Sequence, residues 1–131
     1  MHKILQPAHW APPRGYVNGV AAHGTQVFVA GQIGWNADGR FETDDLVEQT
    51  RQALLNVRAV LAEAGATPEH IVRMTWYLVD RAEYLARAKE IGAAFRDTIG
   101  SYSIAMTAVQ VAALIEQRAK VEIEVTAVVP G

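Results

Sequence analysis

The clearest pattern of apolar and polar residues lies near the C-terminus, over residues 104–130. Along residues 121–129 apolar and polar side chains alternate: Val121, Ile123, Val125, Ala127 and Val129 share one parity, and Glu122, Glu124, Thr126 and Val128 share the other. Successive side chains of a strand point to opposite faces, so this stretch predicts a strand with one buried face. A second apolar run, Ala105–Leu114, precedes it across the polar segment Ile115–Lys120. We therefore predict a β-hairpin with a longer loop.

Two other stretches have the spacing of amphipathic helices. The first covers about residues 44–64, with Thr43, Asp44 and Asp45 as N-cap candidates, Gly65 as the stop, and apolar positions three, four and seven residues apart. Its predicted inward side chains are those of Leu46, Val47, Leu54, Val57 and Leu61. The second opens at Asp80, with Glu83 three residues later, and runs to about Thr98. Its predicted inward side chains are those of Tyr84, Leu85, Ala88, Ile91 and Phe95.

The remaining β signals lie in the first half of the chain and between the helices. Residues 16–22 and 25–30 read as two short strands joined by a tight turn at His23 and Gly24. Residues 71–79 read as a central strand, because they are rich in β-branched and aromatic residues. Residues 1–15 contain three prolines and predict an extended arm packed on the domain, with His9 and Trp10 as packing contacts.

The predicted order is β-β-α-β-α-β-β, which makes residues 1–131 a single α+β domain with both helices on one face of one sheet. The strand at residues 71–79 has apolar residues of both parities. We expect Met74, Trp76 and Leu78 to lie on the sheet face away from the helices. Because such a face is unfavourable in water, the pattern predicts self-association in a closed, symmetric form.

Charge and composition narrow the function classes. The net charge is −2 at a sequence pI near 6.1, and the basic residues are scattered, which argues against nucleic acid as a partner. The absence of cysteine excludes disulfides, thiolate metal sites and a thiol nucleophile. Four isolated histidines do not form a metal-ligand pattern, so we expect no metal. No run is apolar enough for a signal peptide or a membrane span, which predicts a cytoplasmic protein.

Familiar catalytic motifs are missing from the sequence. There is no phosphate-binding loop, and no helix is expected to open on the glycines of GQIGWNADG, as a dinucleotide site requires. Gly31 and Gly34 within it are typical of a bulge or of close approach by backbone or ligand. Two carboxylates, those of Glu122 and Glu124, share one face of an apolar strand. They are either part of a solvated sheet face or part of a site, and alternation alone does not decide between these readings.

Three segments of the chain resemble the RidA (YjgF/YER057c) family of reactive-intermediate deaminases. They are GYVNGV with VFVAGQIG, IVRMTWYLVD, and the end AMTAVQVAALIEQRAKVEIEVTAVV, so the resemblance extends from Tyr16 to Val129. It implies a chorismate-mutase-like fold and a homotrimer with a central barrel and small-molecule clefts at its subunit interfaces. It also implies hydrolysis of enamines and imines to carbonyl compounds and ammonia, with no cofactor. Relatives also carry a description as endoribonucleases, which the acidic pI argues against.

The resemblance assigns roles to individual residues. Tyr16 falls on the tyrosine of the cleft, Gly31 on the glycine whose backbone lies along the ligand, and Glu124 on the glutamate that places the attacking water. The family sequence P-A-R-[ST] contains an arginine that holds the substrate carboxylate. Its aligned segment here is Ile104-Ala105-Met106-Thr107, so Met106 replaces that arginine, and Ala105 and Thr107 flank it in the expected ligand site.

The loss of the arginine leaves three interpretations open. A thioether cannot bind a carboxylate, so the first is a deaminase of altered specificity, for a less anionic or larger substrate. The second is a binding or regulatory protein without turnover, and the third is a pocket filled by core residues. Arg73, Arg118 and Lys120 are candidates to replace the missing cation.

Overall fold

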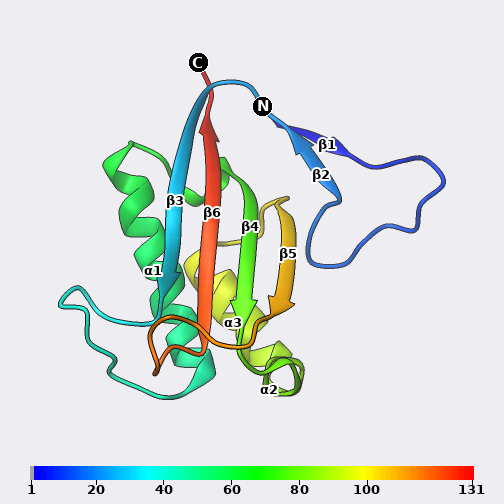
Figure 1. The fold of residues 1–131 in the computed structure, drawn as a ribbon. Helices are drawn as coiled ribbons and strands as arrows, with labels where there is room; N and C mark the ends of the chain where they lie inside the picture. The colour runs from blue at the N-terminus through cyan, green and yellow to red at the C-terminus, as the bar shows by residue number, and fades with distance from the viewer. Residues whose placement is uncertain (1) are drawn as a thin grey trace.

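The computed structural model describes residues 2–131 as one four-stranded sheet packed against helices, with a small separate two-stranded ribbon (Figure 1). The elements in chain order are β1 (Lys3–Leu5), β2 (Gly19–Ala21), β3 (Thr25–Ile33), α1 (Leu46–Glu63), the short 3₁₀ turn η1 (Pro68–His70), β4 (Ile71–Leu78), α2 (Arg81–Ala86), α3 (Ala88–Thr98), β5 (Ala105–Gln110) and β6 (Val121–Val129). The main sheet has the strand order β3-β6-β4-β5, and β1 pairs with β2 in the ribbon. The α+β class and the packing of helices on a sheet are as predicted.

The strand pairings differ from both predicted hairpins. β6 pairs antiparallel with β3 and with β4, and β4 pairs in parallel with β5. The expected hairpin of β5 with β6 is therefore wrong, since β4 lies between these strands. The expected pairing across His23 and Gly24 is also wrong, because β2 pairs with β1. In both cases the turn residues reverse the chain, but each strand pairs with a strand that is distant in the sequence.

One face of the main sheet is covered by helices. α1 lies over β3 and β6, and α3 packs beside α1 behind β4 and β5 (Figure 1). The core between the layers includes Val57, Leu61, Val121 and Ile123, none of which is exposed. α1 begins at its N-cap Asp45, whose side chain accepts a hydrogen bond from the Glu48 N–H at 3.0 Å, and it stops before Gly65, whose φ is 67°. The predicted inward face of this helix is confirmed.

The predicted orientation of β4 is wrong. Met74, Trp76 and Leu78 are 0%, 3% and 3% exposed and face the helices rather than solvent. The pairing of β4 with β6 shifts register between Ile71 and Arg73. This irregularity puts Ile71 and Met74 on the same side of the sheet, although their spacing of three would separate them in a regular strand. The open face of β4 instead carries Arg73, Thr75 and Tyr77, which removes the apolar face that predicted self-association.

The predicted second helix is divided at Arg87 into α2 and α3. Asp80 caps α2 as predicted, by accepting a hydrogen bond from the Glu83 N–H at 3.0 Å. Arg87 pairs with Asp45 and with Glu90, which lowers the pKa of both carboxyl groups. Because the direction of the chain changes at Arg87, the expected inward Leu85 is exposed, whereas Ile91 is buried.

The N-terminal segment does not pack on the domain as predicted. β1 and β2 form a ribbon, and the chain between them loops away from the main sheet (Figure 1). Trp10 is 60% exposed and His9 is also exposed, so neither is a packing contact within this chain. The segment rejoins the sheet at Val17, which forms an isolated parallel bridge to Ala105.

Candidate functional site

The first group of candidate residues lies at the β5 edge of the main sheet. The Val17 N–H donates to the Ile104 carbonyl at 3.0 Å, which fixes the preceding Tyr16 near the start of β5. Tyr16 is 42% exposed. Met106 pairs with Met74, so its side chain is on the helix-covered side, where it packs against the core. Tyr16, Ala105 and Met106 thus lie near one another at this edge of the sheet.

Beside Met106 is an open pocket of about 450 Å³ between β5, the helices and the segment before β5. It is lined by Gly15, Trp76, Tyr84, Ala88, Ile91, Gly92, Phe95, Arg96, Gly100, Ser101, Tyr102, Ser103 and Met106. We call it the aromatic pocket, because four of these residues have aromatic rings. Its size is within the range of about 300 to 1,000 Å³ that small-molecule sites usually have.

Trp76 is the most buried of these rings. Its ring centroid is 6.4 Å from that of Tyr84 in an edge-on arrangement and 6.2 Å from that of Phe95. Burial raises the pKa of Tyr84. The Trp76 Nε1 is buried, and it has no hydrogen-bond partner among residues 2–131. The aromatic pocket therefore has a wall of large apolar side chains with a polar group set into it.

Arg96 is the charged residue of the aromatic pocket. Its Nη1 is 3.4 Å from the position that a Cβ on Gly92, one turn earlier, would take. The guanidinium therefore lies back along α3 over the glycine. In the described part of the chain Arg96 has no ion pair, and no Asp or Glu is among the pocket's lining residues.

The second group of candidate residues lies on the open face of the sheet. Gly31 is within a register irregularity of β3, between Val29 and Gln32. A Cβ at Gly31 would collide with the Glu122 carboxylate, and the Glu122 Cγ would be only 2.9 Å away. Any larger residue must therefore displace Glu122. The glycine leaves space for the Glu122 carboxylate and does not serve to turn the chain.

Glu124 is one step further along β6 on the same face. The Tyr77 hydroxyl donates a hydrogen bond to Glu124 Oε1 at 3.3 Å, and the negative charge of Glu124 raises the pKa of Tyr77. Thr107 and Glu124 both pair with Thr75, so these three residues form one row across the open face. Since neighbouring strands are about 4.8 Å apart, the backbones of Thr107 and Glu124 are about 10 Å apart.

The six predicted site residues thus form two groups within one chain. Tyr16, Ala105 and Met106 are at the β5 edge, and Gly31 and Glu124 are on the open face of β3 and β6, with Thr107 between them on that face. Met106 points to the helix-covered side and Glu124 to the other side. A single chain does not bring Met106 and Glu124 to one ligand.

The three cations proposed to replace the missing arginine have different surroundings. Arg118 pairs with Asp44 at 2.9 Å, and Lys120 pairs with Glu83 at 3.6 Å. Arg73 is exposed on the open face, in a row with Ala105 and Thr126. It lines a second pocket, which also includes Asn18, Thr107 and Met106.

Sequence reasoning missed Arg96 and Glu122. Arg96 has no motif around it, and only the tertiary arrangement of α3 and β5 places it beside Met106. Glu122 had a sequence signal, since it shares a face with Glu124, but its contact with Gly31 depends on the pairing of β3 with β6.

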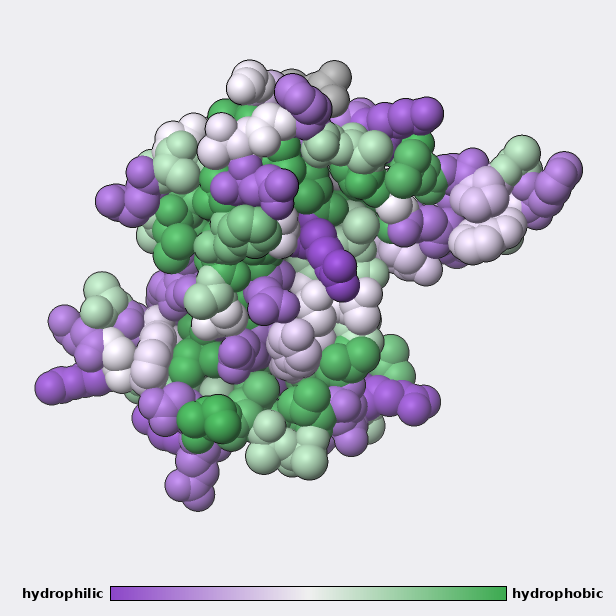
Figure 2. Space-filling view, turned by 45° about the horizontal axis from the view of Figure 1, so that its top comes forward, coloured by the Kyte–Doolittle hydropathy of each residue, from purple (hydrophilic) through white to green (hydrophobic). Residues whose placement is uncertain are grey.

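Other classes of site find no support in residues 2–131. No group of three or more His, Asp or Glu side chains is placed to hold a metal ion. None of the described helices is both long and apolar enough to cross a bilayer. On the open face, Glu122 lies opposite Tyr77, and Arg73 is further along the same face. Hydrophilic and hydrophobic side chains are interspersed in the view of Figure 2.

Comparison with known proteins identifies the family to which the chain belongs. Residues 7–129 match the family described as endoribonuclease L-PSP. The chain therefore belongs to this family, the YjgF/Rid proteins, which confirms the resemblance found in the sequence.

Individual relatives agree with this assignment. The crystal structure of the Rid-family protein YyfB from Yersinia pestis has a TM-score of 0.86 and 32% identity, with 98% of each chain covered. That of Escherichia coli TdcF with bound serine has a TM-score of 0.70 and 32% identity, over 97% of this chain and 98% of TdcF. A 2-iminobutanoate/2-iminopropanoate deaminase from Capra hircus is 32% identical over 103 residues, which are 78% of this chain and 72% of the goat protein.

Proposed function

We propose that this protein is a homotrimeric enamine or imine deaminase. In this proposal, each ligand cleft combines the β5 edge of one subunit with the open-face group of its neighbour. The observation that carries it is the division of the candidate residues. Met106 and Gly15, the neighbour of Tyr16, line a pocket that has no carboxylate in its lining, whereas Glu124 is exposed and Glu122 is partly exposed on another part of the surface. Two neighbouring subunits can bring together the two groups of residues that lie apart in one chain.

The reaction is hydrolysis of a carbon–nitrogen double bond. Water adds to the imine carbon, the electron pair of the double bond moves to nitrogen, and collapse of the adduct expels ammonia and leaves a carbonyl compound. A carboxylate that orients the water and accepts its proton fits this chemistry. We assign that role to Glu124, as the family resemblance implies. Tyr16 covers the ligand and backbone groups near Gly31 hold its polar end.

The support from relatives concerns the class of reaction. The goat relative is named for deamination of 2-iminobutanoate and 2-iminopropanoate. TdcF has been crystallised with serine, a small amino acid. The proposed substrate here is likewise an enamine or imine.

A second candidate function is ligand binding without turnover, in a metabolite-binding or regulatory protein. Met106 favours it, because a methionine cannot hold a substrate carboxylate as the family arginine does. The two functions differ in one measurable property: a binder saturates with ligand but does not change the rate at which an imine decays.

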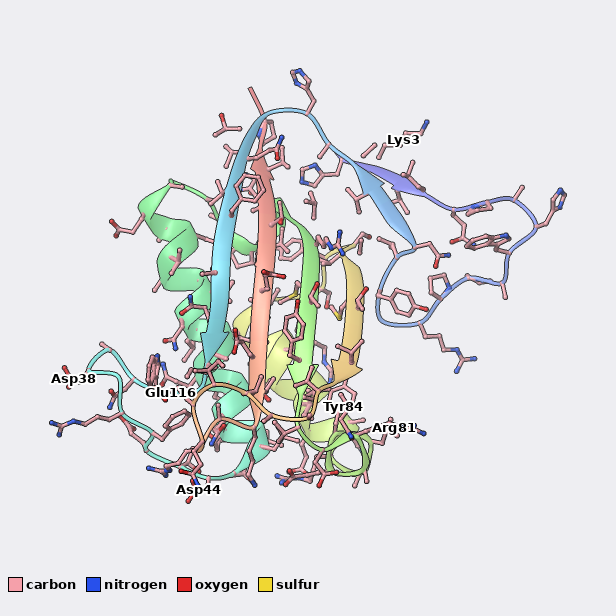
Figure 3. The ribbon with its side chains drawn as sticks, in the orientation of Figure 1. Lys3, Asp38, Asp44, Arg81, Tyr84 and Glu116 are labelled. Atoms are coloured by element: carbon pink, nitrogen blue, oxygen red, sulfur yellow. The ribbon has the colours of Figure 1, made fainter. Side chains whose placement is uncertain are left out.

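The test measures ammonia and 2-oxo acid release from imines that a flavin amino-acid oxidase generates in the assay. Light scattering on the same sample gives the oligomeric state. We expect wild type to accelerate the decay of at least one imine and Glu124→Gln to lose at least tenfold in rate. Glu116→Gln is the matched control, because Glu116 is in the exposed loop before β6 (Figure 3). A monomer, or unaltered activity of Glu124→Gln, would overturn the proposal.

A further inference from the structure

The aromatic pocket contains a cation, Arg96, which lies outside the segment aligned with the family sequence P-A-R-[ST]. We propose that Arg96 binds the substrate carboxylate in place of the arginine that Met106 has replaced. We further propose that the substrate is a 2-imino acid, or its enamine tautomer, with a bulky aromatic or branched apolar side chain. The substrate class rests on the deaminase function proposed above, whereas the role of Arg96 in binding an anion does not.

The first step of the argument is that the Arg96 guanidinium is available. In the described part of the chain, four of the nine arginine side chains have a partner: Arg51 pairs with Asp97, Arg58 donates to the Thr98 carbonyl, Arg87 pairs with Asp45 and Glu90, and Arg118 pairs with Asp44. Arg96 has no such partner within residues 2–131. A guanidinium offers parallel N–H donors that match the two oxygens of a carboxylate.

The second step is the electrostatic character of the aromatic pocket. Its lining has one charged side chain, Arg96, together with the hydroxyl groups of Ser101, Tyr102 and Ser103. No carboxylate of the lining opposes an anionic ligand or competes for the guanidinium. The site therefore favours a ligand with one negative group that can also accept hydrogen bonds from hydroxyls.

The third step is the size and apolar character of the pocket. Tyr84, Phe95 and Met106 are partly buried and line a space of about 450 Å³ in front of the buried Trp76. A substrate with only a methyl or ethyl side chain leaves most of this surface without a partner. An aromatic side chain can stack against the rings and bury apolar area worth about 25 cal/mol per Å². Methionine at 106 adapts its shape to such a group.

Arg73 is the main competitor for this role. It also lines a pocket with Met106, but that pocket is on the open face and has no aromatic residue in its lining. An anion held by Arg73 would therefore lie beside Thr107 and Thr126, away from the aromatic rings. The two arginines thus predict different ligands, which makes them separable by experiment.

The experiment uses the full-length protein and two probes, phenylpyruvate and pyruvate, which are 2-oxo acids with a bulky and a small side chain. Calorimetry measures the affinity for each probe in wild type, Arg96→Gln, Arg73→Gln and Arg81→Gln. Arg81 is the charge-matched control, because it is exposed on α2, from which Tyr84 also comes (Figure 3), and it does not line the aromatic pocket. Thermal melts verify that each variant is folded.

We expect phenylpyruvate to bind wild type at least tenfold more tightly than pyruvate. Arg96→Gln should weaken phenylpyruvate binding at least tenfold, and Arg81→Gln should change it less than twofold. Equal affinity for both probes would overturn the bulky substrate class. Unchanged phenylpyruvate binding in Arg96→Gln, or loss of binding in Arg73→Gln alone, would overturn the assignment to Arg96.

A parallel turnover assay separates this inference from the proposed function. With 2-imino acids generated from phenylalanine and alanine, we expect wild type to hydrolyse the phenylalanine-derived imine faster and Arg96→Gln to lose this preference. If phenylpyruvate binding depends on Arg96 but no imine is hydrolysed, the deaminase proposal fails and Arg96 remains the anion-binding residue of a binding protein.

Discussion

The two faces of the main sheet are formed by the same strands but differ in burial and in the polarity of their side chains. On the helix-covered face, Val121, Ile123 and Val125 of β6 are almost fully buried. On the open face, Glu122 and Glu124 of the same strand are at least partly exposed and contact Gly31 and Tyr77. The covered face determines whether the chain folds. The open face carries the polar groups that the proposed function assigns to a ligand site.

The largest expected effect is on the covered face. Leu54→Ala removes a fully buried side chain of α1 and should lower the free energy of unfolding by about 2 to 5 kcal/mol. Phe28→Ala is the matched change on the open face, where Phe28 is 73% exposed, and it should cost less than about 0.5 kcal/mol in the isolated chain. Urea unfolding measures both.

A comparable cost for Phe28→Ala would contradict the contrast between the faces. It would mean that the phenylalanine is buried in solution, as happens if a neighbouring subunit covers the open face. Dilution of the sample then separates the two cases, because burial by association depends on protein concentration.

An intermediate effect is expected where the open face is tightly packed. Gly31→Ala should destabilise the protein by about 1 kcal/mol, because the added methyl group forces the flexible Glu122 side chain to move. Glu122→Ala removes the obstacle, so the double variant should be more stable than the sum of the single changes predicts. Unfolding free energies of the four proteins form a double-mutant cycle. Simple additivity would show that the clash is relieved in another way.

The smallest expected effect is on the titration of Tyr77. Glu124→Gln should lower the pKa of Tyr77 toward its ordinary value, since the Glu124 charge is the main cause of the increase. Difference absorbance of tyrosinate between wild type and variant measures the shift. Because the folded-state pKa is raised, the stability contribution of the Tyr77–Glu124 contact is complete below about pH 10 and lost as the pH rises through that pKa. A titration curve unchanged by the substitution would contradict the contact.

Local signals in the sequence predicted the elements better than their partners. The inward face of α1, its Asp45 cap and its stop at Gly65 follow from residues within one segment. The predicted hairpins were wrong because turn residues such as His23 and Gly24 specify that the chain reverses, but not which strand then pairs with which. Met74 and Trp76 were assigned to the wrong face because the register shift near Val72 leaves no mark in the apolar pattern.

The candidate site could likewise be predicted only in part from the sequence. Family resemblance, not periodicity, selected Tyr16, Gly31, Glu124 and Met106, and their roles as ligand residues stay predictions. Arg96 could not be found from the sequence, because its relation to Met106 depends on how α3 packs behind β5. Gly92, beside which the Arg96 guanidinium lies, looks in the sequence like any other helical glycine.

The central place of the C-terminal strand has a consequence for biosynthesis. β6 joins β3 to β4, so the main sheet cannot close until residues 121–129 have been made. On a ribosome, nearly the whole chain must emerge while the apolar sides of β3 and β4 still lack their shared neighbour. Unpaired strand edges of this kind are prone to aggregation until residues 121–129 are available to pair with them.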